Sequence, residues 1–82
     1  LFPIFSDEYS IVEIKAGERL AGSSILELDV RANYGINIIA VKRGKDIIVA
    51  PDPNENIEFH DILIVIGHDN DLNRFEKKLV NE

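Results

Sequence analysis

Apolar residues recur along the chain at two spacings, one typical of strands and the other of helices. From Tyr9 to Lys15 apolar and polar positions half alternate, which predicts a first strand. The apolar segments 36–43 and 47–50 predict two further strands. The short connection Gly44-Lys45-Asp46 between them is typical of a hairpin turn, and the prolines that begin at Pro51 end the second of these strands.

A last strand and a last helix follow in the C-terminal third. Segment 57–66 contains the unbroken apolar run Ile62–Ile66, which predicts a strand buried on both faces and ended by Gly67. Asp69 or Asn70 is suited to cap the helix that follows. The apolar stripe of this helix consists of Leu72, Phe75 and Leu79.

A capping box marks the start of another helix. Ser24 precedes an apolar segment and Glu27 follows three residues later, so each side chain can accept a hydrogen bond from the backbone of the other. Gly35 tolerates the left-handed conformation that ends many helices. The signals predict one helix from Ile25 to Tyr34. Its apolar face is expected to hold Ile25, Leu28 and Ala32, with Leu26 and Val30 beside them.

The predicted order of elements is β-α-β-β-β-α, which is an α+β fold. At 82 residues the chain has room for a single domain, which we place at residues 9–82. Residues 1–8 are interpreted as a linker or docking arm. Because the chain begins at Leu1 rather than at a methionine, we expect a fragment of a longer protein. A domain this small and apolar is expected to dimerise.

Charge and composition narrow the classes of partner. The chain carries 15 acidic and 9 basic residues, for a formal charge of −6. The missing basic face argues against binding to nucleic-acid polymers or to a membrane surface. The longest apolar run is far shorter than the roughly 20 residues that span a bilayer, so no membrane insertion is expected. Without cysteine, disulfides and thiolate metal sites are excluded, which suits a reducing cytoplasm.

The motifs of common enzyme classes are missing. No glycine-rich dinucleotide or P-loop fingerprint follows a strand, and Ser24 is explained as a helix cap rather than a nucleophile. Glu58 and His60 are expected on one side of a strand, where they could form half of a metal site or simply be exposed polar residues of an edge strand. Two ligands are too few for a structural zinc site, so no metal is predicted. His68 is expected to contribute to a turn.

A polar cluster lies where the first helix meets the next strand. Arg31 is placed late on the helix, with Asp29 nearby, and Asn37 begins the strand. An arginine at this position can offset the helix dipole, or it can offer a guanidinium fork to a phosphate. The apolar residues available to cover a base are Ile25, Ile36, Ile38 and Pro53.

Four runs, Leu20–Arg31, Tyr34–Gly44, Pro51–Pro53 and Asp61–Gly67, together resemble the TrkA-C domain, also called RCK-C. The resemblance extends over about residues 9–80, and within the family it is greatest to the KtrA-type gating subunits of Ktr potassium transporters. In the family Gly-Asp usually precedes the last strand, and this chain has His60-Asp61 instead. We expect a slightly altered turn there and an unchanged fold.

The resemblance implies a two-fold dimer whose interface binds cyclic di-AMP, a signal that shuts potassium uptake. Arg31 and Asn37 then correspond to the polar partners of the ligand, with Asp29 nearby. The apolar surface around the adenines corresponds to Ile25, Ile36, Ile38 and Pro53. Each half of a two-fold ligand would meet the same half-site.

The resemblance also implies the setting of the domain. The N-terminal RCK domain of such subunits is absent from this chain, and residues 1–8 would be the linker from it. The whole regulator would lie in the cytoplasm, bound peripherally to the membrane through a potassium-transporter subunit. No catalysis and no cofactor are expected. Two alternatives remain open: a purely structural dimerisation module, and a cation-sensing domain that uses carboxylates or His60 at the dimer interface.

Overall fold

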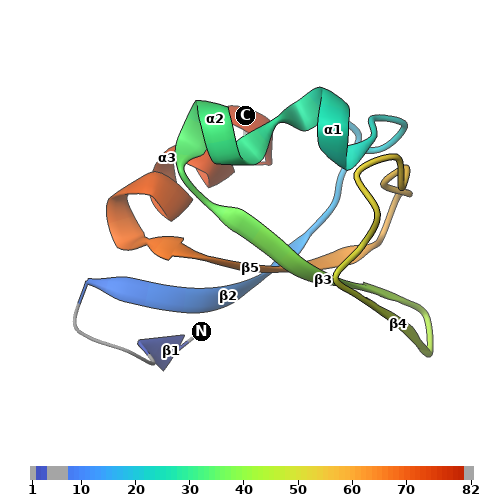
Figure 1. Ribbon diagram of the computed structural model, residues 1–82, viewed down its shortest axis with the longest axis horizontal. Coiled ribbons are helices and arrows are strands. Elements are labelled where there is room, and N and C mark those ends of the chain that lie inside the picture. Colours follow the sequence, from blue (N-terminus) through green and yellow to red (C-terminus); the bar gives the residue numbers. More distant parts are fainter. Residues whose placement is uncertain (1, 4–7, 81–82) are drawn as a thin grey trace.

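Five antiparallel strands form one sheet in the order β1-β2-β5-β3-β4 (Figure 1). The computed structural model describes residues 2–3 and 8–80. The strands are β1 (Phe2–Pro3), β2 (Tyr9–Lys15), β3 (Asn37–Arg43), β4 (Asp46–Val49) and β5 (Ile62–His68). The helices are α1 (Ile25–Leu28), α2 (Val30–Tyr34) and α3 (Asp69–Leu79). The predicted α+β class and the order of its main elements are confirmed.

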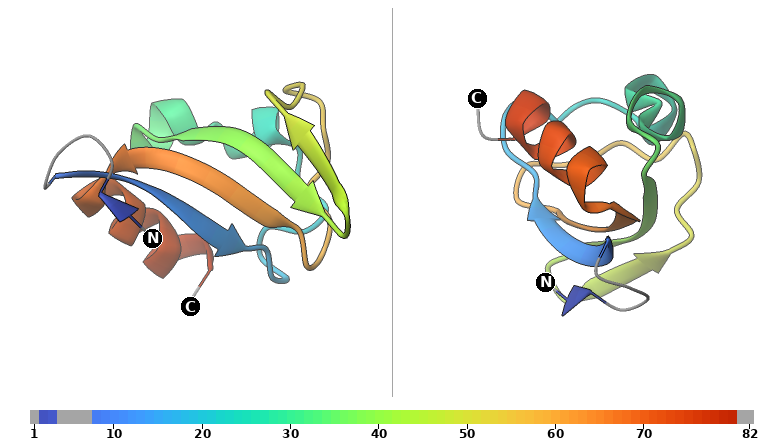
Figure 2. Two further views of the ribbon diagram at one scale, coloured as in Figure 1. Left: turned by 90° about the horizontal axis from the view of Figure 1, so that it is seen from below. Right: turned by 90° about the vertical axis from the view of Figure 1, so that its left-hand side faces the viewer.

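All three helices cover the same face of the sheet (Figures 1 and 2). The core lies between the helices and the sheet and is built from buried side chains of both, together with side chains of the connecting segments. Its members are Ile14, Ala16, Leu20, Val30, Ile36, Ile38, Val41, Ile57, Leu63, Val65, Leu72 and Phe75. Because only one face is covered, β5 alternates: Leu63 and Val65 are buried, whereas Ile62, Ile64 and Ile66 are half-buried. The prediction that this strand is buried on both faces was therefore wrong.

The last strand does not end at Gly67, as the sequence suggested. It continues through His68, because Ser10 and Tyr9 of β2 still offer backbone partners to Gly67 and His68. His68 then caps α3: its Nδ1 accepts the N–H of Asn70 at 3.1 Å. Neither residue predicted as the cap holds that position. The apolar stripe is confirmed, with Leu72 and Phe75 buried and Leu79 half-buried.

The predicted helix from Ile25 to Tyr34 is broken at Asp29. This residue has φ 46° and ψ 50°, the left-handed conformation, and it ends α1 while it begins α2. Short polar side chains such as aspartate visit this region more readily than most residues do. The break changes which side of the second half faces inward, so that Val30 is buried and Ala32 is exposed. Ala32 was expected on the apolar face.

The ends of this helical region follow the sequence signals. The capping box is confirmed, since the Ser24 hydroxyl accepts the Glu27 N–H at 3.1 Å and the Glu27 carboxylate accepts the Ser24 N–H at 2.8 Å. Gly35 is left-handed, with φ 70°, and ends α2 as predicted. The linker predicted for residues 1–8 lies mostly outside the described residues. Within that segment, the backbone of β1 pairs with β2.

Gly67 provides the space into which Ile36 packs, so a larger residue at this position should destabilise the fold. A Cβ built on Gly67 would lie 2.7 Å from Cγ2 of Ile36. Gly67→Ala is therefore expected to lower the free energy of unfolding by about 1–3 kcal/mol, as overpacking does. Gly17→Ala is the matched control, because a Cβ there meets nothing within 4 Å. Urea denaturation measures both variants, and equal midpoints would show that Ile36 moves aside freely.

Candidate ligand-binding site

A hollow of about 240 Å³ opens between the first two helices, the start of β3 and the segment after β4. Its wall is mainly apolar, with an arginine, an aspartate and an asparagine among the lining residues. They are Ile25, Leu26, Asp29, Val30, Arg31, Asn37, Ile38, Pro51 and Pro53. Ligand pockets commonly measure roughly 300–1,000 Å³, so this hollow suits one part of a ligand better than a whole drug-sized molecule.

Backbone hydrogen bonds hold the two walls of the hollow together. The N–H of Leu26 donates to the carbonyl of Pro53 at 2.8 Å, and that of Ile25 donates to Glu55 at 3.1 Å. These two N–H groups belong to the first turn of α1, where a helix has no internal acceptor for them. The segment that carries Pro51 and Pro53 is thereby fixed beside the helix, and its prolines become part of the wall.

Six of the seven predicted site residues line the hollow: Ile25, Asp29, Arg31, Asn37, Ile38 and Pro53. The seventh, Ile36, does not. It is only 1% exposed and packs in the core over Gly67, so the structure places it elsewhere. Three lining residues were not predicted, namely Leu26, Val30 and Pro51. The broken helix explains Leu26 and Val30, because the turn at Asp29 determines where the side chains before and after it lie.

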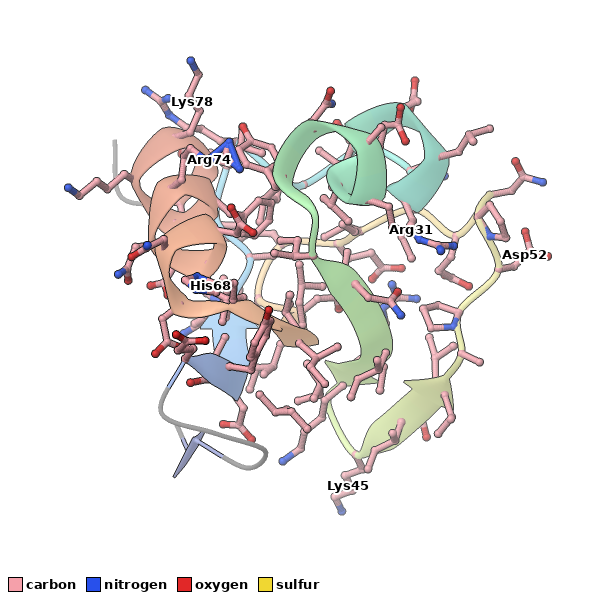
Figure 3. All side chains as sticks on the ribbon, turned by 60° about the vertical axis from the view of Figure 1, so that its left-hand side comes forward. Arg31, Lys45, Asp52, His68, Arg74 and Lys78 are labelled. Atoms are coloured by element: carbon pink, nitrogen blue, oxygen red, sulfur yellow. The ribbon has the colours of Figure 1, made fainter. Side chains whose placement is uncertain are left out.

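Arg31 is the cationic residue of the hollow. Its side chain is exposed, and within residues 2–3 and 8–80 its guanidinium makes no hydrogen bond or ion pair. Figure 3 shows Arg31 on the side of the molecule that carries Asp52, away from Arg74 and Lys78. A guanidinium with unused donors beside an apolar wall can take a phosphate or carboxylate while the wall takes a planar ring.

A second arginine, Arg43 of β3, lies at the centre of an ion-pair network next to the hollow. Its Nε and Nη2 donate to the two oxygens of Asp61 at 2.9 and 2.8 Å, a bidentate pair. Its Nη1 lies 3.2 Å from Glu55 and 3.2 Å from Glu58. The Asp61 carboxylate is 1% exposed and also accepts the Glu58 N–H at 2.8 Å. Sequence reasoning missed this network, because its members come from different segments.

The network sets the charge of both its main members. Burial by itself raises the pKa of Asp61, but the hydrogen bonds from Arg43 and from the Glu58 N–H, together with the positive charge of Arg43, hold that pKa below its usual value. The pKa of Arg43 is raised, chiefly by its hydrogen bond to Asp61. The pair is therefore ionised at neutral pH.

Glu58 and His60 do not have the placement on a strand that the half metal site considered from the sequence assumed. They lie in a turn rather than on one side of a strand, since the Asp61 N–H donates to the Glu58 carbonyl at 3.0 Å. The Glu58 carboxylate pairs with Arg43. No group of three or more histidine, cysteine, aspartate or glutamate side chains that could hold a metal occurs in the part of the chain that the structure describes.

His60 adopts a conformation that favours glycine, with φ 75°. A residue with a Cβ loses roughly 1–2 kcal/mol in the left-handed region, and the greater freedom of unfolded glycine offsets part of that difference. His60→Gly is therefore expected to stabilise the domain by about 0.5–1 kcal/mol in thermal unfolding. Asn54→Gly, at an exposed loop position with ordinary φ, is the control and should not stabilise it. A less stable His60→Gly variant would show that the imidazole itself supports the turn.

The sequence is similar to bacterial potassium-uptake proteins. Residues 9–80 match the TrkA-C domain. The Ktr system potassium uptake protein C of Bacillus subtilis is 57% identical over 76 residues, which are 93% of this chain and 34% of that protein. The Ktr system potassium uptake protein A of the same organism is 47% identical over 73 residues, 89% of this chain and 33% of that protein. The chain thus spans about a third of the length of these relatives.

Two solved structures share the fold and contain a ligand. The RCK C domain of the potassium transport protein KtrA in complex with cyclic di-AMP is 70% identical, with a TM-score of 0.82 over 87% of this chain and 84% of that one. The RCK_C domain dimer of Streptococcus agalactiae BusR, also with cyclic di-AMP, is 28% identical, with a TM-score of 0.77 over 88% and 91% of the two chains. No helix within the described ranges is long and apolar enough to cross a bilayer.

Proposed function

The chain belongs to the TrkA-C (RCK-C) domain family, and from that premise we propose that it is the ligand-sensing domain of a Ktr-type potassium-uptake regulator. Its ligand is cyclic di-AMP, bound at a two-fold dimer interface to inhibit uptake. The observation that carries the proposal is the hollow in which the guanidinium of Arg31, which has no partner among the described residues, adjoins an apolar wall.

The size and symmetry of the ligand fit a half-site of this kind. Cyclic di-AMP has two identical halves, each with one adenine and one phosphate. One hollow of about 240 Å³ supplies apolar surface for a base and one guanidinium for a phosphate. A second copy related by a two-fold axis supplies the same set to the other half. Two chains would therefore bind one ligand, with Asn37 and Asp29 at the polar edge.

The remaining parts of the proposal concern the whole regulator. Residues 1–8 connect this domain to an N-terminal RCK domain. The assembly lies in the cytoplasm and is held at the inner face of the membrane by the potassium-transporter subunit that it gates.

Isothermal titration calorimetry tests the ligand directly. We expect cyclic di-AMP to bind with one ligand for two chains, and we expect no comparable binding of ATP or linear di-AMP. Cyclic di-GMP should bind at least about a hundredfold more weakly, because each unsatisfied polar group of guanine buried on the apolar wall weakens binding by roughly 1–3 kcal/mol and the ligand has two guanines. Equal binding of both cyclic dinucleotides would contradict the apolar wall as the selective element.

The same titration separates this proposal from its alternatives. A chain that dimerises in sedimentation equilibrium but binds no cyclic dinucleotide would be a structural dimerisation module. The cation-sensing alternative has no supporting ligand group among the described residues. It predicts heat on titration with a divalent cation alone, and that control belongs in the same series.

A further inference from the structure

We infer that Arg43 is a positioning residue for the ligand site: through Glu55 and Asn56 it holds the segment that carries Pro51 and Pro53 against the buried Asp61. The inference rests on the proposed function for the identity of the ligand. It concerns a residue that does not itself line the hollow.

One side of the Arg43 guanidinium is fixed to the body of the domain. Arg43 lies on β3, next to the central strand β5. Its bidentate pair with Asp61 uses Nε and Nη2, at 2.9 and 2.8 Å, and Asp61 is buried directly before β5. Two parallel hydrogen bonds determine the orientation of the guanidinium plane as well as its position. The side chain is thus a rigid support.

The same guanidinium also contacts the loop that carries Pro51 and Pro53 and forms one wall of the hollow. Nη1 donates to the carboxylate of Glu55 at 3.2 Å, and Nη2 donates to the carbonyl of Asn56 at 3.0 Å. Glu55 is the residue whose carbonyl accepts the N–H of Ile25, and Asn56 forms a β-bridge with Ser24. The arginine therefore holds, from one side, the same two residues that the start of α1 holds from the other.

This loop has little apolar burial to keep it in place. Between Pro51 and Ile57 only Ile57 is buried, while Asp52, Pro53 and Asn54 are exposed. Polar contacts must then decide where Pro53 lies. They include the two backbone bonds to α1, the bonds of Ile57 with Gly22 and Ser23, the turn bonds to Asp52 and the Arg43 network. If the wall is already ordered in the free protein, binding does not have to reduce the conformational entropy of the loop. The affinity is then higher without any new contact.

Two glutamates on the same nitrogen make a matched pair for the test. Glu55 and Glu58 each place a carboxylate oxygen 3.2 Å from Nη1 of Arg43. Glu55 belongs to the loop, whereas Glu58 belongs to the turn before β5. Glu55→Gln and Glu58→Gln thus remove equal charges from the same guanidinium, and both leave its pair with Asp61 intact. Only Glu55→Gln removes an ion pair between Arg43 and the loop.

The first measurement needs no ligand. Amide hydrogen exchange of the whole chain by NMR follows the N–H of Leu26, which donates to the carbonyl of Pro53. We expect this amide to exchange about three- to fivefold faster in Glu55→Gln than in the wild type, the effect of losing one half-buried ion pair. In Glu58→Gln its rate should not change. Equal rates in both variants would overturn the positioning role.

The second measurement is the affinity for cyclic di-AMP by calorimetry, beside the thermal midpoint of each variant. We expect Glu55→Gln to bind about three- to fivefold more weakly per hollow and Glu58→Gln to bind as the wild type does, at similar thermal midpoints. Equal affinities of the two variants would overturn the inference while leaving the proposed function intact. A wild type that binds no cyclic di-AMP would overturn the proposed function, and the exchange rates would still decide whether Arg43 orders the loop.

Discussion

Arg43→Met is expected to destabilise the domain by about 3–5 kcal/mol. The substitution keeps a long apolar stem but leaves Asp61, which is 1% exposed, as a buried carboxylate without its cation. Breaking a buried pair by removing one partner has an effect of this size, because the remaining charge stays desolvated. Urea denaturation at neutral pH measures the loss. Arg74→Met is the control: its pair with Asp71 and its hydrogen bond to the Tyr34 carbonyl are both exposed, so about 1 kcal/mol or less is expected.

The dependence of this loss on pH identifies its cause. In the wild type the pKa of Asp61 lies below its usual value, so the pair stabilises the folded state above about pH 3.9, and that contribution is lost as the pH falls toward the folded pKa. Without Arg43, burial is the larger influence and raises the pKa of Asp61. As the pH falls, the buried carboxyl of the variant is protonated and loses its charge, so the variant regains stability. The difference in unfolding free energy between wild type and Arg43→Met should therefore begin to shrink above about pH 4, as the pH falls through the raised pKa of Asp61 in the variant, and should go on shrinking until the pH reaches the lowered pKa of Asp61 in the wild type. A constant difference from pH 7 to pH 3 would contradict a charge-based origin and indicate lost packing.

The sequence was sufficient where the deciding interactions are local. The strand at Tyr9–Lys15, the capping box at Ser24 and the left-handed end at Gly35 all depend on residues within a few positions of one another. Each was predicted correctly for that reason. Gly67 has the same residue type as Gly35 but continues a strand, because its role is to leave space for Ile36 rather than to turn the chain.

The features that could not be predicted from the sequence depend on contacts with residues far along the chain. Asp29 breaks the first helix although no glycine or proline marks the position, and the gain appears only in the packing of Val30 against the rest of the core. Arg43 and Asp61 are 18 residues apart, so no local pattern relates them. The candidate site shows the same division. The resemblance supplied six of its lining residues, whereas the structure places the seventh, Ile36, in the core against Gly67, which lies far along the chain.

Arg31→Ala is expected to weaken the binding of cyclic di-AMP by about a hundredfold or more. A charge-assisted hydrogen bond contributes roughly 1.5–3 kcal/mol, and in a two-fold site the substitution removes it from both halves. Arg31→Lys keeps the charge but loses the fork, so an intermediate affinity is expected. Calorimetry measures all three proteins at the same salt concentration. Raising the salt should weaken wild-type binding more than that of the alanine variant, because only the wild type sets a cation against the phosphates.

The stability of the same variants separates a ligand contact from a helix-dipole effect. Arg31 lies in the last turn of α2, where a cation can stabilise a helix by about 0.3–1 kcal/mol. If Arg31 acts on the ligand, Arg31→Ala changes the affinity and leaves the thermal midpoint close to that of the wild type, since its guanidinium has no partner in residues 2–3 and 8–80. Arg74→Ala, on α3 and outside the hollow, should leave the affinity unchanged. A lower midpoint together with wild-type affinity in Arg31→Ala would remove Arg31 from the site and assign it to the helix end.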